Sequence, residues 1–388
     1  MPNVAVVCNS LPPYRLHVHQ RIAKEMASEI TLWTICTHET TGDRWEFVAP
    51  PEINPISFGK GHTVLRQNSP KFALSEFQKG GKIIDWLINN RVSAVIMLGY
   101  NDPARLRIIR WCAANDVPLF LWGDSNIYGD TVTGFKAWLK ERVVGRIISS
   151  CTGALPCGTC GRAFFARYGA KEDRMFYFPV EPDYDLVTGL SPEFIEKVRQ
   201  DFNISTERRR FIFSARITQV KRPDLMVDAF VRIAARRPNW DLLMLGEGEL
   251  RQELMARVPE HLKDRIIWTG FLDDQAVISA LYRLSDALVL PSDFEPWGLV
   301  INEAAAAGIA IISSTVVGAS NELVRDGVNG RIFPTGDLSA LEEAMLDISE
   351  GNRIDTLKAN SPKILDRWRK RGDPIEGLRK ALRFCKVI

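Results

Sequence analysis

The chain has 388 residues, of which 46% are hydrophobic and 25% are charged, and its formal net charge is +3. This composition is typical of a globular protein, and the length predicts about two domains. A net charge this small gives no indication of nucleic-acid binding, because proteins that bind polyanions usually concentrate a much larger basic excess on one face. Affinity for phosphate or for a membrane must therefore come from local patches.

The first ten residues have no basic segment before their short apolar run, so we expect a first β-strand rather than a secretion signal, and a cytoplasmic protein. The longest uncharged stretch, 304–321, is nearly as long as a membrane span, but Gly308 and Gly318 interrupt it. We interpret it as the end of a helix followed by a buried strand.

The seven cysteines are odd in number and scattered, which is typical of reduced, mostly buried thiols. Cys157 and Cys160 have the spacing of a metal or redox pair. A zinc site would need a second pair or nearby histidines, so packing on a helix is the favoured interpretation, and no metal is expected.

Short β-branched runs alternate with helix-length segments along most of the chain, which predicts an α/β fold with parallel sheets and helices on both faces. In the first half we expect strands at 4–8, 29–35, 94–98, 119–122 and 154–156, and helices near 15–27, 74–89, 103–115, 134–149 and 161–168. The second half restarts the pattern with strands at 211–214, 242–245, 266–268, 287–290, 310–312 and 331–333, and a helix at 224–235.

Two similar doubly wound units are implied. Residues 181–210 have the composition of a linker carrying one helix, so we expect a first domain over 1–182 and a second over 183–362. The basic segment 363–388 is expected to form a C-terminal helix. Doubly wound sheets bind ligands at the carboxyl ends of their strands, and two such units facing each other would form a cleft.

The most informative segment is PSDFEPWGLVINE at 291–303, which follows an apolar strand and leads into an alanine-rich helix. Pro296 suits a first helical turn, so Glu295 is expected at the mouth of the helix and Glu303 inside it. The free amides of Gly298, Leu299 and Val300 would then point toward a phosphate bound between the two glutamates.

This segment resembles the two-glutamate motif of the retaining glycosyltransferases of family 4, which have the two-domain GT-B fold. Further segments resemble that family in the same order: FSAR ending at Arg216, KRPD beginning at Lys221, LGEGE at 245–249 and TGFL at 269–272. The resemblance implies a nucleotide-sugar donor whose diphosphate contacts Arg216 and Lys221, fixed cations that stabilise the charge on the leaving group.

The resemblance also implies donor contacts from Gly246, Glu247, Phe271 and Leu272, and a C-terminal helix within 363–388 that crosses back to the first domain. Glu303 would hydrogen-bond the ribose, and Glu295 would bind the transferred sugar. The anomeric configuration would be retained, without cofactor or metal. Simpler interpretations stay open: Arg216 and Lys221 as solvated loop cations, and Glu303 as a surface carboxylate. Gly246 and Gly248 fit a tight turn as well as a ligand.

The first domain departs from the family pattern. Many relatives carry a histidine after a later strand, whereas here that position reads WGDSN, so Asp124 either replaces the histidine in a catalytic role or caps a helix. His17 and His19 have the chemistry of metal ligands but fit a helix start better.

Residues 134–149 are expected to form an amphipathic basic helix in which Phe135, Trp138, Leu139, Val143 and Ile147 recur at helical spacing. An ordinary helix that turns this apolar side to the core is the favoured interpretation. Docking on an anionic membrane, with Trp138 and Lys140 at the contact, is the alternative.

The leading hypothesis is sugar transfer from a nucleotide donor to a saccharide, glycolipid or polyprenyl-linked acceptor in surface-polysaccharide biosynthesis. The alternatives are a nucleotide-sugar epimerase on the same fold and a nucleotide-binding protein without catalysis. A dehydrogenase is disfavoured because no G-x-G-x-x-G follows either first strand.

Overall fold

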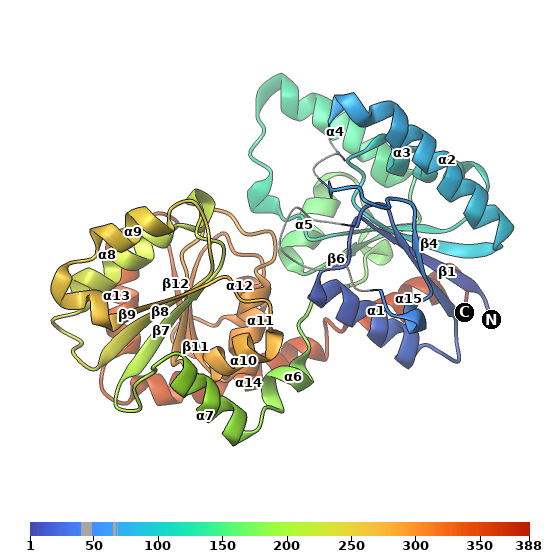
Figure 1. The fold of residues 1–388 in the computed structure, drawn as a ribbon. Coiled ribbons are helices and arrows are strands. Elements are labelled where there is room, and N and C mark those ends of the chain that lie inside the picture. Colours follow the sequence, from blue (N-terminus) through green and yellow to red (C-terminus); the bar gives the residue numbers. More distant parts are fainter. Residues whose placement is uncertain (40–48, 65–66, 68) are drawn as a thin grey trace. The chain divides into compact units, whose positions relative to one another are not determined.

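The computed structural model describes residues 1–39, 49–64, 67 and 69–388. The chain divides into two compact units (Figure 1). Unit 1 comprises Met1–Glu181 together with Arg371–Ile388, and unit 2 comprises Pro182–Lys370. Each unit contains one six-stranded sheet. Within the described part of the chain, no helix has the length and apolarity to cross a membrane.

The sheet of unit 1 has the strand order β3-β2-β1-β4-β5-β6, with parallel pairing. Its strands are β1 (Asn3–Cys8), β2 (Thr31–Cys36), β3 (Pro55–Ser57), β4 (Val92–Leu98), β5 (Leu119–Gly123) and β6 (Gly153–Pro156). The β-branched runs form strands because both faces are covered, and residues Val4 to Val7 are fully buried. The sequence did not predict β3, a three-residue edge strand that starts with proline.

Helices of unit 1 lie on both faces of this sheet. They are α1 (Pro13–Glu25), α2 (Ala73–Asn89), α3 (Pro103–Ala114), α4 (Gly134–Ser149), α5 (Thr159–Arg167) and α15 (Pro374–Phe384). One hydrophobic core joins the sheet to Ile83 of α2, Ile108 of α3 and Val144 of α4, so these three helices form one layer (Figure 1). The other face carries α1, which contacts α15.

Helix α4 packs on the core of unit 1, as the favoured interpretation expected, but of the five apolar residues at helical spacing only Ile147 lies beside that core. Phe135, Trp138, Leu139 and Val143 are all exposed. The helix contacts the core instead through Val144 and Ile148, with Ile147 packed beside them.

The sheet of unit 2 has the order β12-β11-β10-β7-β8-β9 and is also parallel. Its strands are β7 (Arg209–Ser214), β8 (Trp240–Leu245), β9 (Ile266–Gly270), β10 (Ala287–Leu290), β11 (Ala310–Ser314) and β12 (Gly330–Phe333). The helices are α6 (Tyr184–Thr188), α7 (Pro192–Asp201), α8 (Pro223–Ile233), α9 (Arg251–Arg257), α10 (Gln275–Arg283), α11 (Leu299–Ala306), α12 (Ser320–Leu323), α13 (Leu338–Ile348) and α14 (Arg353–Arg369).

Two details of this unit differ from the expectation. The segment expected to be a linker with one helix carries two, α6 and α7. The expected limit at residue 362 falls inside α14, which continues to Arg369, and the chain rejoins unit 1 only at Arg371. The uncharged stretch 304–321 contains the end of α11 and the buried strand β11, as the sequence predicted.

Candidate active site

The predicted donor residues lie at the carboxyl ends of neighbouring strands in unit 2. Arg216 follows β7, Glu247 follows β8, Phe271 follows β9 and Glu295 follows β10. Because the strands are parallel, these loops emerge at the same edge of the sheet. The sequence-predicted set is therefore carried on one edge of one unit.

Lys221 and Glu295 form an ion pair at this edge. Their side chains are 14% and 16% exposed, so both are partly shielded yet still reach solvent. The Ser292 hydroxyl also donates to Glu295, at 3.4 Å. The pair holds the loop after β7 against the loop after β10, and the Asp293 amide, which donates to the Val220 carbonyl at 2.9 Å, reinforces that junction.

Helix α11 begins at Leu299, three residues after Pro296, so the expectation that Pro296 occupies the first helical turn was wrong. The reason is Gly298, which adopts a left-handed conformation with φ of 91° at the cap position. A Cβ atom there would lie 2.8 Å from the Val317 side chain and 3.1 Å from Cγ of Glu295. The glycine therefore lets Glu295 lie close to the start of the helix, where Leu299 and Val300 have amides without intrahelical acceptors.

Trp297, Asn302 and Tyr184 form a buried hydrogen-bonded triad that anchors the segment 291–303 within unit 2. The sequence did not predict this triad. The Trp297 indole donates to Asn302 at 3.0 Å, and the Asn302 amide donates to the hydroxyl of Tyr184 at 2.9 Å. Two motif residues thus serve the internal structure rather than a ligand. Tyr184 comes from the segment that we interpreted as linker, and its sequence context contains no signal for this contact.

Glu303 lies on α11, half-buried beside Tyr282 of α10. Burial raises the pKa of Glu303 to about 7, and the nearby Tyr282 hydroxyl offsets part of that rise. The Tyr282 side chain is fully buried, and its hydroxyl makes no hydrogen bond of normal geometry to any residue that the structure describes. Burial and the charge of Glu303 raise the pKa of Tyr282 well above its usual value. The sequence did not predict this tyrosine as part of the site.

The glycines after β8 are required by the turn itself. Gly246 has a φ of 138°, and a Cβ atom on it would collide with the Ala215 carbonyl. A Cβ atom on Gly248 would collide with the Ile217 carbonyl. Phe271 and Leu272 are half-buried just beyond β9. A direct role of Gly246, Glu247, Phe271 or Leu272 in donor binding stays a prediction.

Polar residues at the corresponding edge of unit 1 are arranged differently. Asp124 is exposed directly after β5, and Asn126 provides the cap at this position, accepting from the Gly129 amide at 3.1 Å. After β2, His38 contacts Glu76, and Lys79 donates to both Glu76 oxygens at 2.8 and 2.9 Å. His38, Glu76 and Lys79 are buried.

The residues with metal-ligating chemistry serve other purposes. His17 and His19 lie within α1, and the His19 ring nitrogen Nδ1 is 2.8 Å from the Thr34 hydroxyl. Cys157 and Cys160 are buried free thiols at the start of α5. Among the described residues, no group of three or more His, Cys, Asp or Glu is arranged to hold a metal ion.

The comparisons with known proteins include a family match within unit 2. Residues 194–367 match the family model of glycosyl transferases group 1. That range contains the Lys221–Glu295 pair, Gly298 and Glu303. The chain is 32% identical to a D-inositol 3-phosphate glycosyltransferase of Pseudarthrobacter chlorophenolicus over 162 residues, which are 41% of this chain and 38% of that protein. It is 34% identical to the lipopolysaccharide core biosynthesis mannosyltransferase LpsB of Rhizobium meliloti over 137 residues, 33% of this chain and 38% of LpsB.

Solved structures extend the likeness to both units. The Anabaena protein HepE, solved in complex with UDP and glucose, superimposes with a TM-score of 0.73 and 17% identity over 100% of both chains. The chain therefore has the GT-B fold, with two Rossmann-like units. In sequence, the matches span about two fifths of the length of the first curated relatives, 38% and 42%.

Proposed function

We propose that the protein is a retaining glycosyltransferase of family 4, which transfers a sugar from a nucleotide-sugar donor to a saccharide, glycolipid or polyprenyl-linked acceptor. The observation that carries the proposal is the Lys221–Glu295 ion pair beside the start of α11, with Glu303 further along the same helix. A cation, free helix amides and two carboxylates on one strand edge match the parts of a nucleotide sugar: diphosphate, ribose and hexose.

The leaving nucleoside diphosphate would be stabilised by Arg216, Lys221 and the amides at the start of α11. An ammonium group has three donors. Lys221 can therefore keep its bond to Glu295 while donating to a phosphate oxygen. Fixed donors of this kind stabilise developing negative charge without reorganisation during the reaction. The proposed reaction accordingly uses no metal and no cofactor.

The two glutamates take different roles in this proposal. Glu303 hydrogen-bonds the ribose hydroxyls, and Glu295 binds hydroxyls of the transferred sugar beside Lys221. Attack from the face that the diphosphate leaves would retain the anomeric configuration, with the departing phosphate helping to remove the acceptor proton. Asp124, exposed at the strand edge of unit 1, is the proposed counterpart of the catalytic histidine that many relatives carry.

We place the reaction in surface-polysaccharide biosynthesis, in the cytoplasm and peripheral to the inner face of the cytoplasmic membrane. The likeness to LpsB, named for lipopolysaccharide core biosynthesis, supports this setting. A glycolipid or polyprenyl-linked acceptor is embedded in a bilayer, so an enzyme that uses it must work at the membrane surface.

The decisive experiment is a panel of nucleoside diphosphates in a thermal-shift assay, followed by transfer assays with the matching nucleotide sugars. HepE was solved with UDP, so UDP is the first nucleotide to test. A nucleotide at about 100 times its dissociation constant should stabilise the fold by roughly 2.7 kcal/mol. Transfer should proceed undiminished in EDTA, and NMR of the fresh product should give the anomeric configuration of the donor.

Other outcomes would contradict the proposal. Loss of turnover in EDTA that magnesium restores would exclude the metal-independent mechanism. Conversion of the donor into its epimer without any acceptor would identify an epimerase. Tight nucleotide binding with no turnover of any donor and acceptor pair would favour a binding protein without catalysis.

A further inference from the structure

The outward face of α4 is apolar where a surface helix is usually polar. Phe135 is 74% exposed, and Trp138, Leu139 and Val143 are 48%, 48% and 49% exposed. Phe135 and Trp138 stack with their ring centroids 5.4 Å apart. Four large apolar side chains on consecutive turns of one helix make a continuous patch rather than scattered exposed residues.

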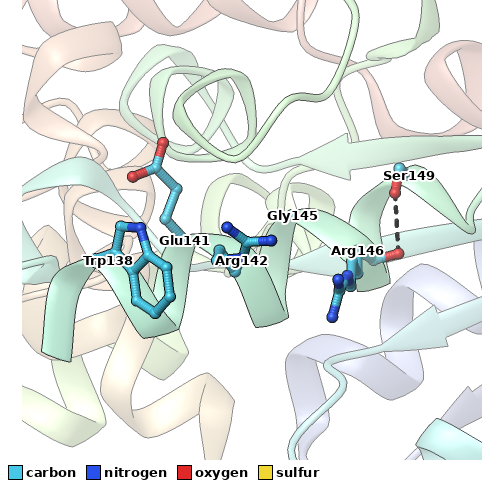
Figure 2. A pocket seen from close by; sticks show the side chains of 6 residues that line it. All are labelled: Trp138, Glu141, Arg142, Gly145, Arg146 and Ser149. Carbon is cyan, nitrogen blue, oxygen red and sulfur yellow. Dashed lines mark hydrogen bonds between the residues drawn. The ribbon is translucent and has the colours of Figure 1, made fainter. Parts of the chain in front are cut away.

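Cations lie among these apolar groups. Arg142 and Arg146 share the outward face, one turn apart, and Lys136 is exposed beside Phe135. The Arg142 guanidinium lies 5.0 Å from the Trp138 ring centroid. Figure 2 shows Trp138, Arg142 and Arg146 along the hollow that they line on this helix, with Glu141 beside Trp138. Glu141 is the helix's only acidic residue, so the face is basic.

The inner side of α4 is fixed, so its outward face has a defined orientation. Val144 and Ile148 pack into the core of unit 1. Lys140 donates to Asp130 at 2.8 Å, and Asp130 also accepts from the Tyr168 hydroxyl at 2.7 Å. Lys140, which the sequence suggested as a membrane contact, therefore makes an ion pair within unit 1. The cations on the outer side are Lys136, Arg142 and Arg146.

The other helices of this layer also carry exposed apolar side chains. In α2, which packs beside α3 in the layer that also contains α4, Leu74 is 71% exposed, Phe77 is 46% exposed and Ile88 is 52% exposed. The Arg107 guanidinium of α3 lies 4.4 Å from the Phe77 ring centroid. The combination of an exposed aromatic ring with an arginine thus recurs across the layer.

We infer that this helix layer of unit 1, centred on α4, docks on an anionic lipid bilayer. Phe135, Trp138 and Leu139 would enter the headgroup region, where aromatic rings are favourable, and Lys136, Arg142 and Arg146 would contact anionic headgroups. This inference assigns a surface to the peripheral location proposed above and rests on it. Donor binding in unit 2 does not depend on it.

Charge favours a bilayer over a second copy of the chain as the occupant. In a symmetric dimer the same patch of both copies is in contact, so Lys136, Arg142 and Arg146 would face a surface of the same sign, and like charges oppose that contact. An anionic lipid surface instead attracts Lys136, Arg142 and Arg146 together. The net charge of the whole chain, +3, is too small to produce strong attraction except through such a patch.

The test is co-sedimentation of the full chain with vesicles, either of phosphatidylcholine alone or mixed with phosphatidylglycerol. The unchanged protein should pellet with the mixed vesicles at low salt, far less with neutral ones, and progressively less as salt rises. Each cation at the surface strengthens binding about fivefold. The double variant Arg142→Gln with Arg146→Gln should therefore bind roughly 25-fold more weakly, and Phe135→Ser with Trp138→Ser should lose binding to both vesicle types.

Matched controls use exposed residues outside the layer. Arg236→Gln with Lys380→Gln removes the same charge, and Val328→Ser removes an exposed apolar side chain from unit 2. Both should bind vesicles like the unchanged protein. All variants should keep their melting temperature and their nucleotide-induced thermal shift, which separates this inference from the proposed activity.

Three results would overturn the inference. The first is no pelleting with anionic vesicles at low salt. The second is an equal loss of binding in the charge-matched control, which would make the attraction unspecific. The third is a dimer in light scattering that Phe135→Ser with Trp138→Ser converts to a monomer, since the face would then be an interface between copies.

Discussion

Both units have an ion pair near the edge where their strands end, but the pair of unit 2 is partly exposed and the pair of unit 1, on α2, is buried. In unit 2, Arg216 is exposed, and Lys221 and Glu295 are paired while still reaching solvent. In unit 1, Glu76 and Lys79 are 1% and 5% exposed and contact each other and His38. The charges of unit 2 thus stay accessible to a ligand, as the proposed function requires, whereas those of unit 1 hold α2 to the loop after β2.

Burial explains why the two sets of charges differ in function. Burial alone would raise the pKa of Glu76, but hydrogen bonds from His38 and Lys79 lower it to about 2. A ligand that displaced Lys79 would leave an uncompensated carboxylate in the interior, which is costly. Lys221 and Glu295 can change partners at lower cost because water still reaches them. A site for a charged substrate therefore requires partial exposure as well as the right residues.

The largest expected effect comes from breaking the buried pair of unit 1. Glu76→Leu should lower the free energy of unfolding by about 3–5 kcal/mol, because Lys79 is left buried without its carboxylate. Denaturant unfolding near neutral pH would measure it. Because the pKa of Glu76 is depressed, its stabilising contribution is present above pH 4.5 and is lost as the pH falls toward 2.

The controls separate the ion pair from the substitution itself. Asp85→Leu changes an exposed acid on the same helix and should alter stability by no more than about 0.5 kcal/mol. Glu76→Leu with Lys79→Met removes both charges and should recover most of the loss. If Glu76→Leu were as stable as Asp85→Leu, the contrast between the two edges would be wrong.

The next effect tests the exposed pair of unit 2. Glu295→Gln should lower kcat by about 100-fold or more while leaving the affinity for the nucleoside diphosphate nearly unchanged. The reason is that the proposed contact is to the transferring sugar, which changes charge and shape in the transition state. Kinetics with the full donor and calorimetry with the free nucleotide would measure the two quantities.

Asp293→Asn is the matched control, since Asp293 lies two residues away and pairs with Arg222 at 3.1 Å. It should keep kcat within a few-fold. Loss of nucleotide binding in Glu295→Gln, with turnover intact in the bound state, would reverse the roles assigned to the two glutamates.

Much of the fold could be predicted from the sequence, because the alternation of apolar strands and helices is local. The gathering of Lys221, Glu295 and Gly298 at one strand edge could also be predicted, since they occur in segments that resemble the family's motifs and follow the same order. The distant residues that hydrogen-bond to those segments could not be predicted. Tyr184 reaches Asn302 across 118 positions of sequence, and no local pattern records such a contact. In α4 the spacing of the apolar residues could be predicted, but not which of them face the core, because that depends on which side of the helix the sheet lies.

A smaller effect is expected from the triad of Trp297, Asn302 and Tyr184. This triad is buried, whereas the Lys221–Glu295 pair of the same unit is partly exposed. Tyr184→Phe removes the acceptor of the Asn302 amide and leaves a buried donor unsatisfied, which should cost about 1–3 kcal/mol in unfolding free energy. Tyr128→Phe, at a tyrosine that is 41% exposed, should have little effect on stability. Equal stability of the two variants would show that the triad contributes nothing.

The smallest effect concerns Glu303. This residue is half-buried, and it is proposed to bind the ligand. Its pKa of about 7 lies above the ordinary 4.5, so the folded chain keeps a proton there that the unfolded chain has lost between these values. The contribution of Glu303 to folding stability therefore falls as the pH rises from 4.5 to 7, and it levels off above 7. An ionised carboxylate accepts hydrogen bonds from ribose hydroxyls better than the protonated acid does.

Affinity for the nucleoside diphosphate should accordingly rise with pH, by up to about tenfold between pH 6 and pH 8, which corresponds to roughly 1.4 kcal/mol. The phosphate group of the nucleotide also titrates near this range, so the comparison must be made with Glu303→Gln, which keeps that titration and lacks the carboxylate. Calorimetry across this range should give a weaker affinity and a smaller pH dependence for Glu303→Gln. In the variant Tyr282→Phe, the midpoint of the plot of affinity against pH should lie at higher pH than in the unchanged protein, because the Tyr282 hydroxyl lowers the pKa of Glu303. Identical profiles for the unchanged protein and Glu303→Gln would exclude ribose binding by an ionised Glu303, and the site would then depend on Lys221, Glu295 and the helix amides alone.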